Sequence, residues 1–347
     1  NPPEYNKSVR DFDIVTYDRV KRIYIEEDFA AWKEYAYHAQ IHGAILAYLE
    51  IKKKNFYSIV SDVDGKRFVT ARGWEDLSVV MKVYEKQGMP IDYDFIVQYL
   101  QDPEIARDFA VYYELYRKYN QIYRVPELLE GTYPENVLSI QNAPFDEKLS
   151  LIGLLLDALG QEFVTYARSE AAQKELLTQL GYLRMDLKEG RGDAKALLER
   201  QCDSHKTLTL HKKKAGLLSR EELRSAHDLE LMLDACISLV AEKGSGDVRT
   251  DFGLVKQYFD EREEARQKQI VDAGRHLSNA FDFLSRVFGE GQELVIFLSE
   301  LSAGYYSLKF VSECGNEEYY KYNRLLLLKD RSEELTQEVM ELLALDD

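Results

Sequence analysis

The residue types and spacing that come closest to a metal site belong to Cys202, His205 and His211, in a C-x-x-H pattern with a second histidine six positions on. Zinc prefers sulfur and imidazole ligands, but a structural zinc site needs a fourth ligand. The adjoining run HKKKAG would also surround the site with cations. We therefore favour a polar interhelical loop here, with a zinc-stabilised helical domain as an alternative.

A second pair of histidines, His38 and His42, has the four-residue spacing of one helix face. Gly43 adjoins this pair, and no carboxylate completes a catalytic triad beside it. We interpret both histidines as surface or helix-end residues.

The motifs of self-contained enzymes are missing from the sequence. No G-x-x-x-x-G-K-[ST] run occurs, and Gly65-Lys66 is followed by arginine in an expected hairpin turn, so nothing cradles a triphosphate as a P-loop does. No run of four apolar residues leads into Asp-Glu to hold magnesium, and G-x-S-x-G, H-E-x-x-H and C-x-x-C are absent. This chain alone is therefore not expected to be an active enzyme.

Composition predicts a folded protein that does not bind nucleic acid broadly. The chain has 347 residues, of which 45% are hydrophobic and 31% charged, enough for two or three compact units. Its 61 acidic and 45 basic side chains give a formal net charge of −16. Such a charge argues against a nucleic-acid-binding face.

Cysteine usage and hydropathy indicate the cellular setting. Three scattered cysteines do not form a disulfide framework, so we expect a reducing, cytoplasmic environment. No apolar run reaches the roughly 20 residues of a membrane span. The best candidate, LSLIGLLLDALG, is broken by Asp157 and is expected to form a buried amphipathic helix.

Helical signals dominate, with one expected hairpin at 56–70, where two β-branched and aromatic runs flank an Asp-Gly pair. Asp28 and Asp102 are expected to cap helices, Pro103 to begin one, and Gly88 to end one. Helical spacing places one aromatic face on the run DFAVYYELYRKY, which we interpret as helix packing rather than a ligand cage: Phe109, Tyr112, Tyr113, Tyr116 and Tyr119.

The run VPELLEGTYPENVLSIQNAPF is rich in turn residues and is the expected unit boundary, with a new unit starting near Phe145. Ser219 and Glu222 have the spacing of a capping box. A long helix is expected from about Thr250 to Phe288. The fold class is therefore mainly α with one small hairpin.

Three short segments carry a family resemblance. The Asn1-Pro2 pair resembles the sensor 1 Asn-Pro that ends a core strand in MoxR-like AAA+ ATPases. The run TYDRVKRI resembles the turn that carries that family's arginine finger, here Arg19. The run FVTARGWEDL resembles the sensor 2 segment, in which Arg72 follows two small residues and opens a lid helix.

The departures from this family pattern are Val20, where phenylalanine is usual, and the Gly-Trp pair that follows Arg72. The resemblance implies that a P-loop and an acidic magnesium-binding strand lie upstream of Asn1. It divides the chain into an α/β core remnant (1–22), a lid-like helical domain (23–125) and a helical extension (145–347).

The resemblance also implies a role for each of the three polar residues. Phosphoryl transfer to water depends mainly on positioning and on neutralising phosphate charge. Asn1 would orient the attacking water or contact the γ-phosphate, since its amide both donates and accepts. Arg72 would reach the nucleotide of its own subunit through a bidentate fork, and Arg19 would enter the neighbouring subunit's site.

The function implied is that of a ring-forming, chaperone-like ATPase, a hexamer that remodels or matures a protein client. ATP and Mg²⁺ are the cofactors of the full-length parent, and the isolated chain is expected to be inactive. A von Willebrand factor A domain protein is a partner class that the resemblance implies.

The alternative function is a nonenzymatic helical scaffold or adaptor that binds a protein partner through residues 145–347. Each site residue also has a structural interpretation. Asn1 would be only the end of the chain, Arg19 a surface ion-pair partner, and Arg72 a cover over Trp74 through a cation–π contact.

Overall fold

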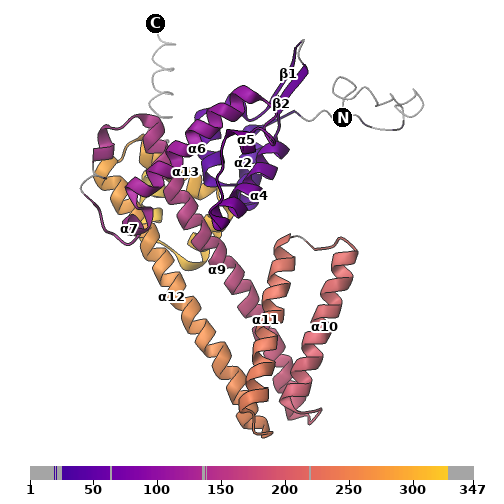
Figure 1. The fold of residues 1–347 in the computed structure, drawn as a ribbon. Helices are drawn as coiled ribbons and strands as arrows, with labels where there is room; N and C mark the ends of the chain where they lie inside the picture. Colours follow the sequence, from indigo (N-terminus) through magenta and orange to yellow (C-terminus); the bar gives the residue numbers. More distant parts are fainter. Residues whose placement is uncertain are drawn as a thin grey trace.

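The computed structural model describes residues 19, 21, 26–62, 65–134, 137, 139–218 and 220–326, and these residues are mainly α-helical (Figure 1). The chain starts with α2 (Phe29–His38), α3 (Gly43–Ile51) and a 3-10 turn, η1 (Lys53–Asn55). Strands β1 (Ser58–Asp62) and β2 (Gly65–Val69) follow and pair antiparallel, with Ser58 opposite Val69. The predicted mainly-α class with one small hairpin is confirmed.

Three helices follow the hairpin: α4 (Ala71–Gln87), α5 (Tyr93–Ile96) and α6 (Pro103–Tyr123). Their ends lie where capping chemistry places them. The Asp102 carboxylate accepts the Glu104 amide at 3.0 Å ahead of Pro103, and Gly88 ends α4 in the left-handed region at φ +66°. Asp28 likewise accepts the Ala30 amide at 2.8 Å at the start of α2. All of these predicted ends are confirmed.

The compact head of the molecule continues with α7 (Val125–Leu129), a 3-10 turn, η2 (Ser139–Asn142), and the first half of α9 (Phe145–Lys188). The second half of α12 (Val248–Phe288), α13 (Gln292–Ala303) and α14 (Tyr305–Cys314) return to it, followed by helical residues 317–326. One apolar core joins side chains from 36–166 and from 273–322. Packing therefore runs across the boundary expected between 125 and 145.

An arm of long helices leaves the head (Figure 1). It consists of the second half of α9, α10 (Ala194–Lys214), α11 (Arg220–Lys243) and the first half of α12. These helices have their own apolar core, which includes Leu183, Leu198, Leu233 and Val255. Helix α10 runs back toward the head, so the α10–α11 connection lies at the end of the arm nearer the head (Figure 1).

The predicted long helix and the predicted aromatic face are both found. Helix α12 begins two residues before the expected Thr250 and ends at Phe288. On α6, Phe109, Tyr113 and Tyr116 are buried in the head core. Ser219, the first residue of the expected capping box, lies outside the described residues.

Helix α9 is long and apolar enough, by length and composition alone, to cross a membrane, and α13 with α14 passes the same test if their 87° bend is ignored. Half of the apolar window of α9 is buried inside the fold, and a helix in a protein core gives the same signal. The apolar run that Asp157 interrupts is thus a buried helix, as predicted.

Candidate functional site

The three predicted site residues fall in different parts of the chain. Asn1 lies outside the described residues. Arg19 is exposed to solvent. Arg72 lies in the first turn of α4, directly after β2.

The Arg72 side chain is a solvent-exposed cation at a helix start. It is 89% exposed, and its Nε lies 3.6 Å from an Asp76 carboxylate oxygen, one turn along the helix. Such an exposed i,i+4 pair contributes little to stability, about 0.3–0.5 kcal/mol. Trp74 is fully buried, whereas Arg72 lies on the solvent face, so the cation–π interpretation of Arg72 is wrong.

The Gly73-Trp74 pair that departs from the family pattern has a packing reason. A Cβ at Gly73 would lie 2.9 Å from the Tyr99 carbonyl oxygen, so only glycine lets the helix start approach that backbone. The Trp74 indole donates to the Phe56 carbonyl at 3.2 Å. The Phe68 amide of β2 donates to the Gln101 carbonyl at 3.1 Å. These contacts fix the hairpin and the start of α4, and so the position of Arg72.

The stretch around Cys202 is not a loop, so that prediction is wrong. Cys202, His205 and His211 all lie within α10, because the apolar residues of that helix pack into the arm core. The Cys202 thiol donates to Asp234 at 3.3 Å, and a His205 ring nitrogen lies 3.2 Å from the Ala226 carbonyl. Among the described residues, no group of three or more His, Cys, Asp or Glu side chains is placed to hold a metal ion.

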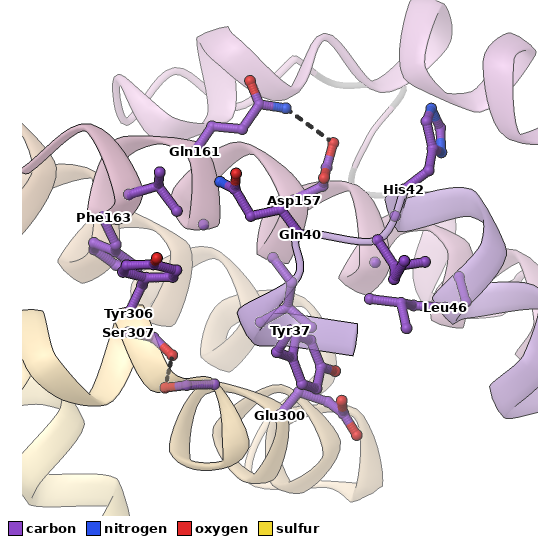
Figure 2. Close-up of a pocket in the computed structure, with 18 of the residues that line it drawn as sticks. Tyr37, Gln40, His42, Leu46, Asp157, Gln161, Phe163, Glu300, Tyr306 and Ser307 are labelled. Atoms are coloured by element: carbon purple, nitrogen blue, oxygen red, sulfur yellow. Dashed lines mark hydrogen bonds between the residues drawn. The ribbon is translucent and has the colours of Figure 1, made fainter. Parts of the chain in front are cut away.

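A cavity of about 650 Å³ lies in the head, between α2, α3 and α4 on one side and α9, α13 and α14 on the other (Figure 2). Leu46 and Phe163 are among its apolar residues, and Tyr37 and Tyr306 are among its tyrosines. Figure 2 shows the Gln161 amide directed at the Asp157 carboxylate on the wall that α9 forms. The volume is in the range of small-molecule sites.

His42 begins one hydrogen-bonded chain at this cavity. It is buried and caps α3, where its Nδ1 accepts the Ala44 amide at 3.1 Å. Its Nε2 lies 2.9 Å from Glu85, and Glu85 accepts the Tyr113 hydroxyl at 2.7 Å. Burial raises the pKa of Glu85, but these two hydrogen bonds, together with the charges of His42 and Arg117, outweigh burial and hold the pKa below its usual value. The helix-end prediction for His42 is confirmed.

Asp157 lines the same cavity but has fewer hydrogen-bond partners than Glu85. The carboxylate accepts one hydrogen bond from the described residues, from Gln161 at 3.3 Å. Burial raises the pKa of Asp157, and the nearby His42 and Lys82 offset this only in part. Asp157 is partly buried at the cavity wall, and a carboxylate there with a single weak donor is costly, because its charge has lost part of its solvation by water.

The Tyr116 hydroxyl and Asp157 both lie close to Gly43. A Cβ at Gly43 would come within 2.8 Å of that hydroxyl oxygen and 2.9 Å of the Asp157 Cβ. The hydroxyl is buried and has no hydrogen-bond partner in the described part of the chain. Burial raises the pKa of Tyr116 well above its usual value, so the hydroxyl stays neutral.

Another wall of the cavity is an ion-pair cluster. The Lys33 ammonium contacts Glu50 at 2.7 Å and also contacts Glu300 of α13, and all three side chains are largely buried. Burial raises the pKa of Glu50, but hydrogen bonds from Lys33 and Lys53 outweigh it and lower the pKa below its usual value. The cluster therefore ties α2 and α3 to α13 across the cavity.

Gln40 lies at the cavity with a strained backbone. Its φ of +54° is in the left-handed region, at the position after a helix end where glycine is usual. That conformation costs a non-glycine residue about 1–2 kcal/mol. Its carbonyl accepts a hydrogen bond from Lys82. Strain of this kind gathers at functional sites.

Sequence reasoning did not find this cavity. Its polar residues come from six helices and the α2–α3 turn, and Lys33 and Glu300 alone are 267 positions apart. One signal was present, the acidic Asp157 inside an otherwise apolar run.

Comparisons with known proteins add no assignment: no protein family, curated protein or solved structure matches the chain.

Proposed function

We propose that this chain is the C-terminal portion of a MoxR-like AAA+ ATPase that couples ATP hydrolysis, in a cytoplasmic ring, to remodelling or maturation of a protein client. The observation that carries the proposal is the setting of Arg72. It is an exposed guanidinium in the first turn of a helix that starts directly after a hairpin, where sensor 2 is expected.

The helix start around Arg72 fits a phosphate. The first amides of α4 add partial positive charge at this end of the helix. A guanidinium presents a planar fork that binds phosphate oxygens in a bidentate way. The Gly73 and Trp74 contacts hold this end of the helix in place. Little backbone conformational entropy is therefore lost when a ligand binds here.

Each of the three residues is proposed to act at a nucleotide site of the ring. Arg72 binds the nucleotide of its own subunit and reports lid closure. Arg19 reaches the neighbouring subunit's nucleotide and makes hydrolysis depend on assembly. Asn1 orients the attacking water. Bound ATP with Mg²⁺ supplies the phosphoryl group, and the P-loop that holds it is proposed to lie upstream of Asn1.

The test uses the protein expressed with the residues encoded upstream of Asn1. We expect ATP hydrolysis, and we expect Arg19→Ala to lower kcat by about a thousandfold or more. Arg72→Ala should also abolish turnover, whereas Arg200→Ala, an exposed arginine on α10, should leave it unchanged. The isolated 1–347 chain should show no turnover.

Mixing the two variants gives a sharper test. An Arg19→Ala subunit keeps a working Arg72, and an Arg72→Ala subunit keeps a working Arg19. Because one residue is proposed to act in its own subunit and the other in the neighbour, mixed rings should regain part of the activity. If neither substitution affects hydrolysis, or if the native protein has no upstream nucleotide-binding domain, the proposal is wrong.

The nonenzymatic adaptor is the second candidate, and the surface of the arm favours it. On α10 and just after it, Leu208, Leu210 and Leu217 are 54%, 51% and 71% exposed, beside the basic run at 212–214. Partner capture that needs this surface but neither nucleotide nor residues 1–125 would favour the adaptor over the ATPase.

A further inference from the structure

The charged side chains that line the head cavity are either paired or exposed to solvent, with one exception. Lys33 binds Glu50 and Glu300, Glu85 binds His42 and Tyr113, and Lys82 donates to a backbone carbonyl. Lys86 is exposed to solvent. Asp157, with one amide at 3.3 Å, is the remaining charged group on the cavity wall.

The environment of Asp157 calls for a positively charged donor. A carboxylate has about four acceptor positions, and a cation supplies both hydrogen bonds and the compensating charge. Tyr37, Phe163 and Tyr306 line the same cavity, and aromatic faces attract cations and pack against apolar groups. An anion would instead face an acidic group that no cation neutralises directly.

The glycines that line the cavity differ in their surroundings: two have close neighbours, and one faces open space. Gly43 is required by Tyr116 and Asp157, and Gly153 by Ala47, whose Cβ would lie 3.0 Å from an added Cβ. Gly160, in the middle of α9, has no such neighbour, since an added Cβ meets no heavy atom within 4 Å. A glycine inside a helix costs about 1 kcal/mol relative to alanine. Gly160 therefore leaves the α9 backbone open to the cavity, as three other glycines within α9 and α12 leave helix backbone open elsewhere.

We propose that this cavity binds a small organic molecule with an ammonium or amidinium group on an apolar or aromatic body. Asp157 takes the cationic group, and the aromatic and aliphatic side chains hold the body. The molecule passes close to the α9 backbone at Gly160. This site is separate from the proposed nucleotide site at Arg72 and does not depend on the ATPase proposal.

The test uses the 1–347 chain without nucleotide and a matched set of probes. Phenethylamine and benzamidine supply the cation, 2-phenylethanol is a neutral analogue, and 3-phenylpropionate is an anionic one. We expect the two cationic probes to raise the melting temperature in a concentration-dependent way and to bind in calorimetry. The alcohol should bind more weakly and the anion should not bind.

Three variants locate the binding. Asp157→Asn should weaken amine binding by about tenfold or more and remove the preference over the alcohol, as expected for losing a charge-assisted hydrogen bond. Gly160→Leu fills the cavity and should abolish binding of every probe. Gly181→Leu makes the same change on the same helix, at an exposed arm position with no neighbour within 4 Å, and should bind normally.

Folding of each variant is checked by circular dichroism, and Gly160→Ala replaces Gly160→Leu if the larger side chain prevents folding. With alanine we expect weaker but measurable amine binding and a melting temperature at least that of the parent. The proposal is overturned if the anion binds as tightly as the cationic probes or if Gly160→Leu keeps full binding. It is also overturned if neither cationic probe binds with a Kd below about 10 mM.

Discussion

At the scale of single residues, the head cavity keeps groups that lower stability. Gln40 adopts a left-handed backbone where glycine would be unstrained, and Asp157 holds a partly buried carboxylate with one weak donor. Proteins keep such residues where binding or chemistry requires them, since selection for stability would remove them elsewhere.

The first residue-scale prediction concerns Asp157 and pH. Because the pKa of Asp157 is raised in the folded state, its neutral form favours folding. This contribution is complete below the unfolded pKa of about 3.9 and is lost as pH rises through the folded pKa. Asp157→Asn, which stays neutral, should therefore be more stable than the parent at pH 7.

Urea unfolding at several pH values checks this expectation. The stability gained from Asp157→Asn should shrink toward zero below about pH 3.5, where both proteins carry a neutral side chain. Asp203→Asn, on the exposed surface of α10, is the control and should give no such pH-dependent gain. A gain from Asp157→Asn that is the same at pH 7 and pH 3.5 would contradict the burial argument.

At the scale of elements, the start of α4 is a packed joint rather than a free helix end. The Thr70 hydroxyl accepts the Gly73 amide at 3.3 Å, and Gly73 lets the helix lie against the Tyr99 carbonyl. This joint connects the hairpin, α4 and the turn before α6. It therefore decides where the exposed Arg72 lies relative to the rest of the head.

The prediction at this scale is that Gly73→Ala destabilises the protein. Alanine improves helix propensity by about 1 kcal/mol, but its Cβ would sit 2.9 Å from a backbone oxygen that cannot move without moving Tyr99. Overpacking of this kind costs about 1–3 kcal/mol, so the net change should be a loss. Gly181→Ala, with open space around it, should instead raise the melting temperature.

At the scale of the whole molecule, head and arm have separate apolar cores joined by two long helices. Helix α9 runs from the head into the arm and α12 runs back. At the head end of α12, His276 lies 2.8 Å from Glu162 of α9 and 3.1 Å from Glu130 after α7. Polar contacts of this kind fix the returning helix, while each core stabilises its own part.

The whole-molecule prediction is that the arm unfolds separately when its core is weakened. Leu233 is fully buried in the arm core, and Leu233→Ala should cost about 2–5 kcal/mol there. Both tryptophans of the chain, Trp32 and Trp74, belong to the head. In urea, Leu233→Ala should therefore lose helical circular dichroism before tryptophan fluorescence changes.

Leu277→Ala, in the head core, is the matched control. It should shift the fluorescence transition to lower urea concentration, because Leu277 belongs to the same apolar core as the tryptophans. Coincident transitions in Leu233→Ala would mean that head and arm unfold as one cooperative unit, which would contradict the two-core interpretation.

The sequence alone determined the features that depend on neighbouring residues. The caps at Asp28 and Asp102, the glycine end at Gly88 and the hairpin were predictable, because each satisfies backbone groups a few residues away. The stretch from Cys202 to His211 was predicted wrongly as a loop, since the residues that pack α10 into the arm core lie at or before Cys202, among them Leu197 and Leu198. The nucleotide roles of Asn1, Arg19 and Arg72 remain predictions.

The side chains that line the head cavity could be identified from the tertiary structure alone. His42, Glu85, Asp157 and Glu300 lie far apart along the chain, and no spacing rule connects them. Whether a buried side chain is paired or alone depends on helices that pack from elsewhere, and packing has no short-range signal in sequence. The sequence could mark Asp157 as an interruption in an apolar run, but only the fold shows that it faces a cavity with one weak hydrogen bond.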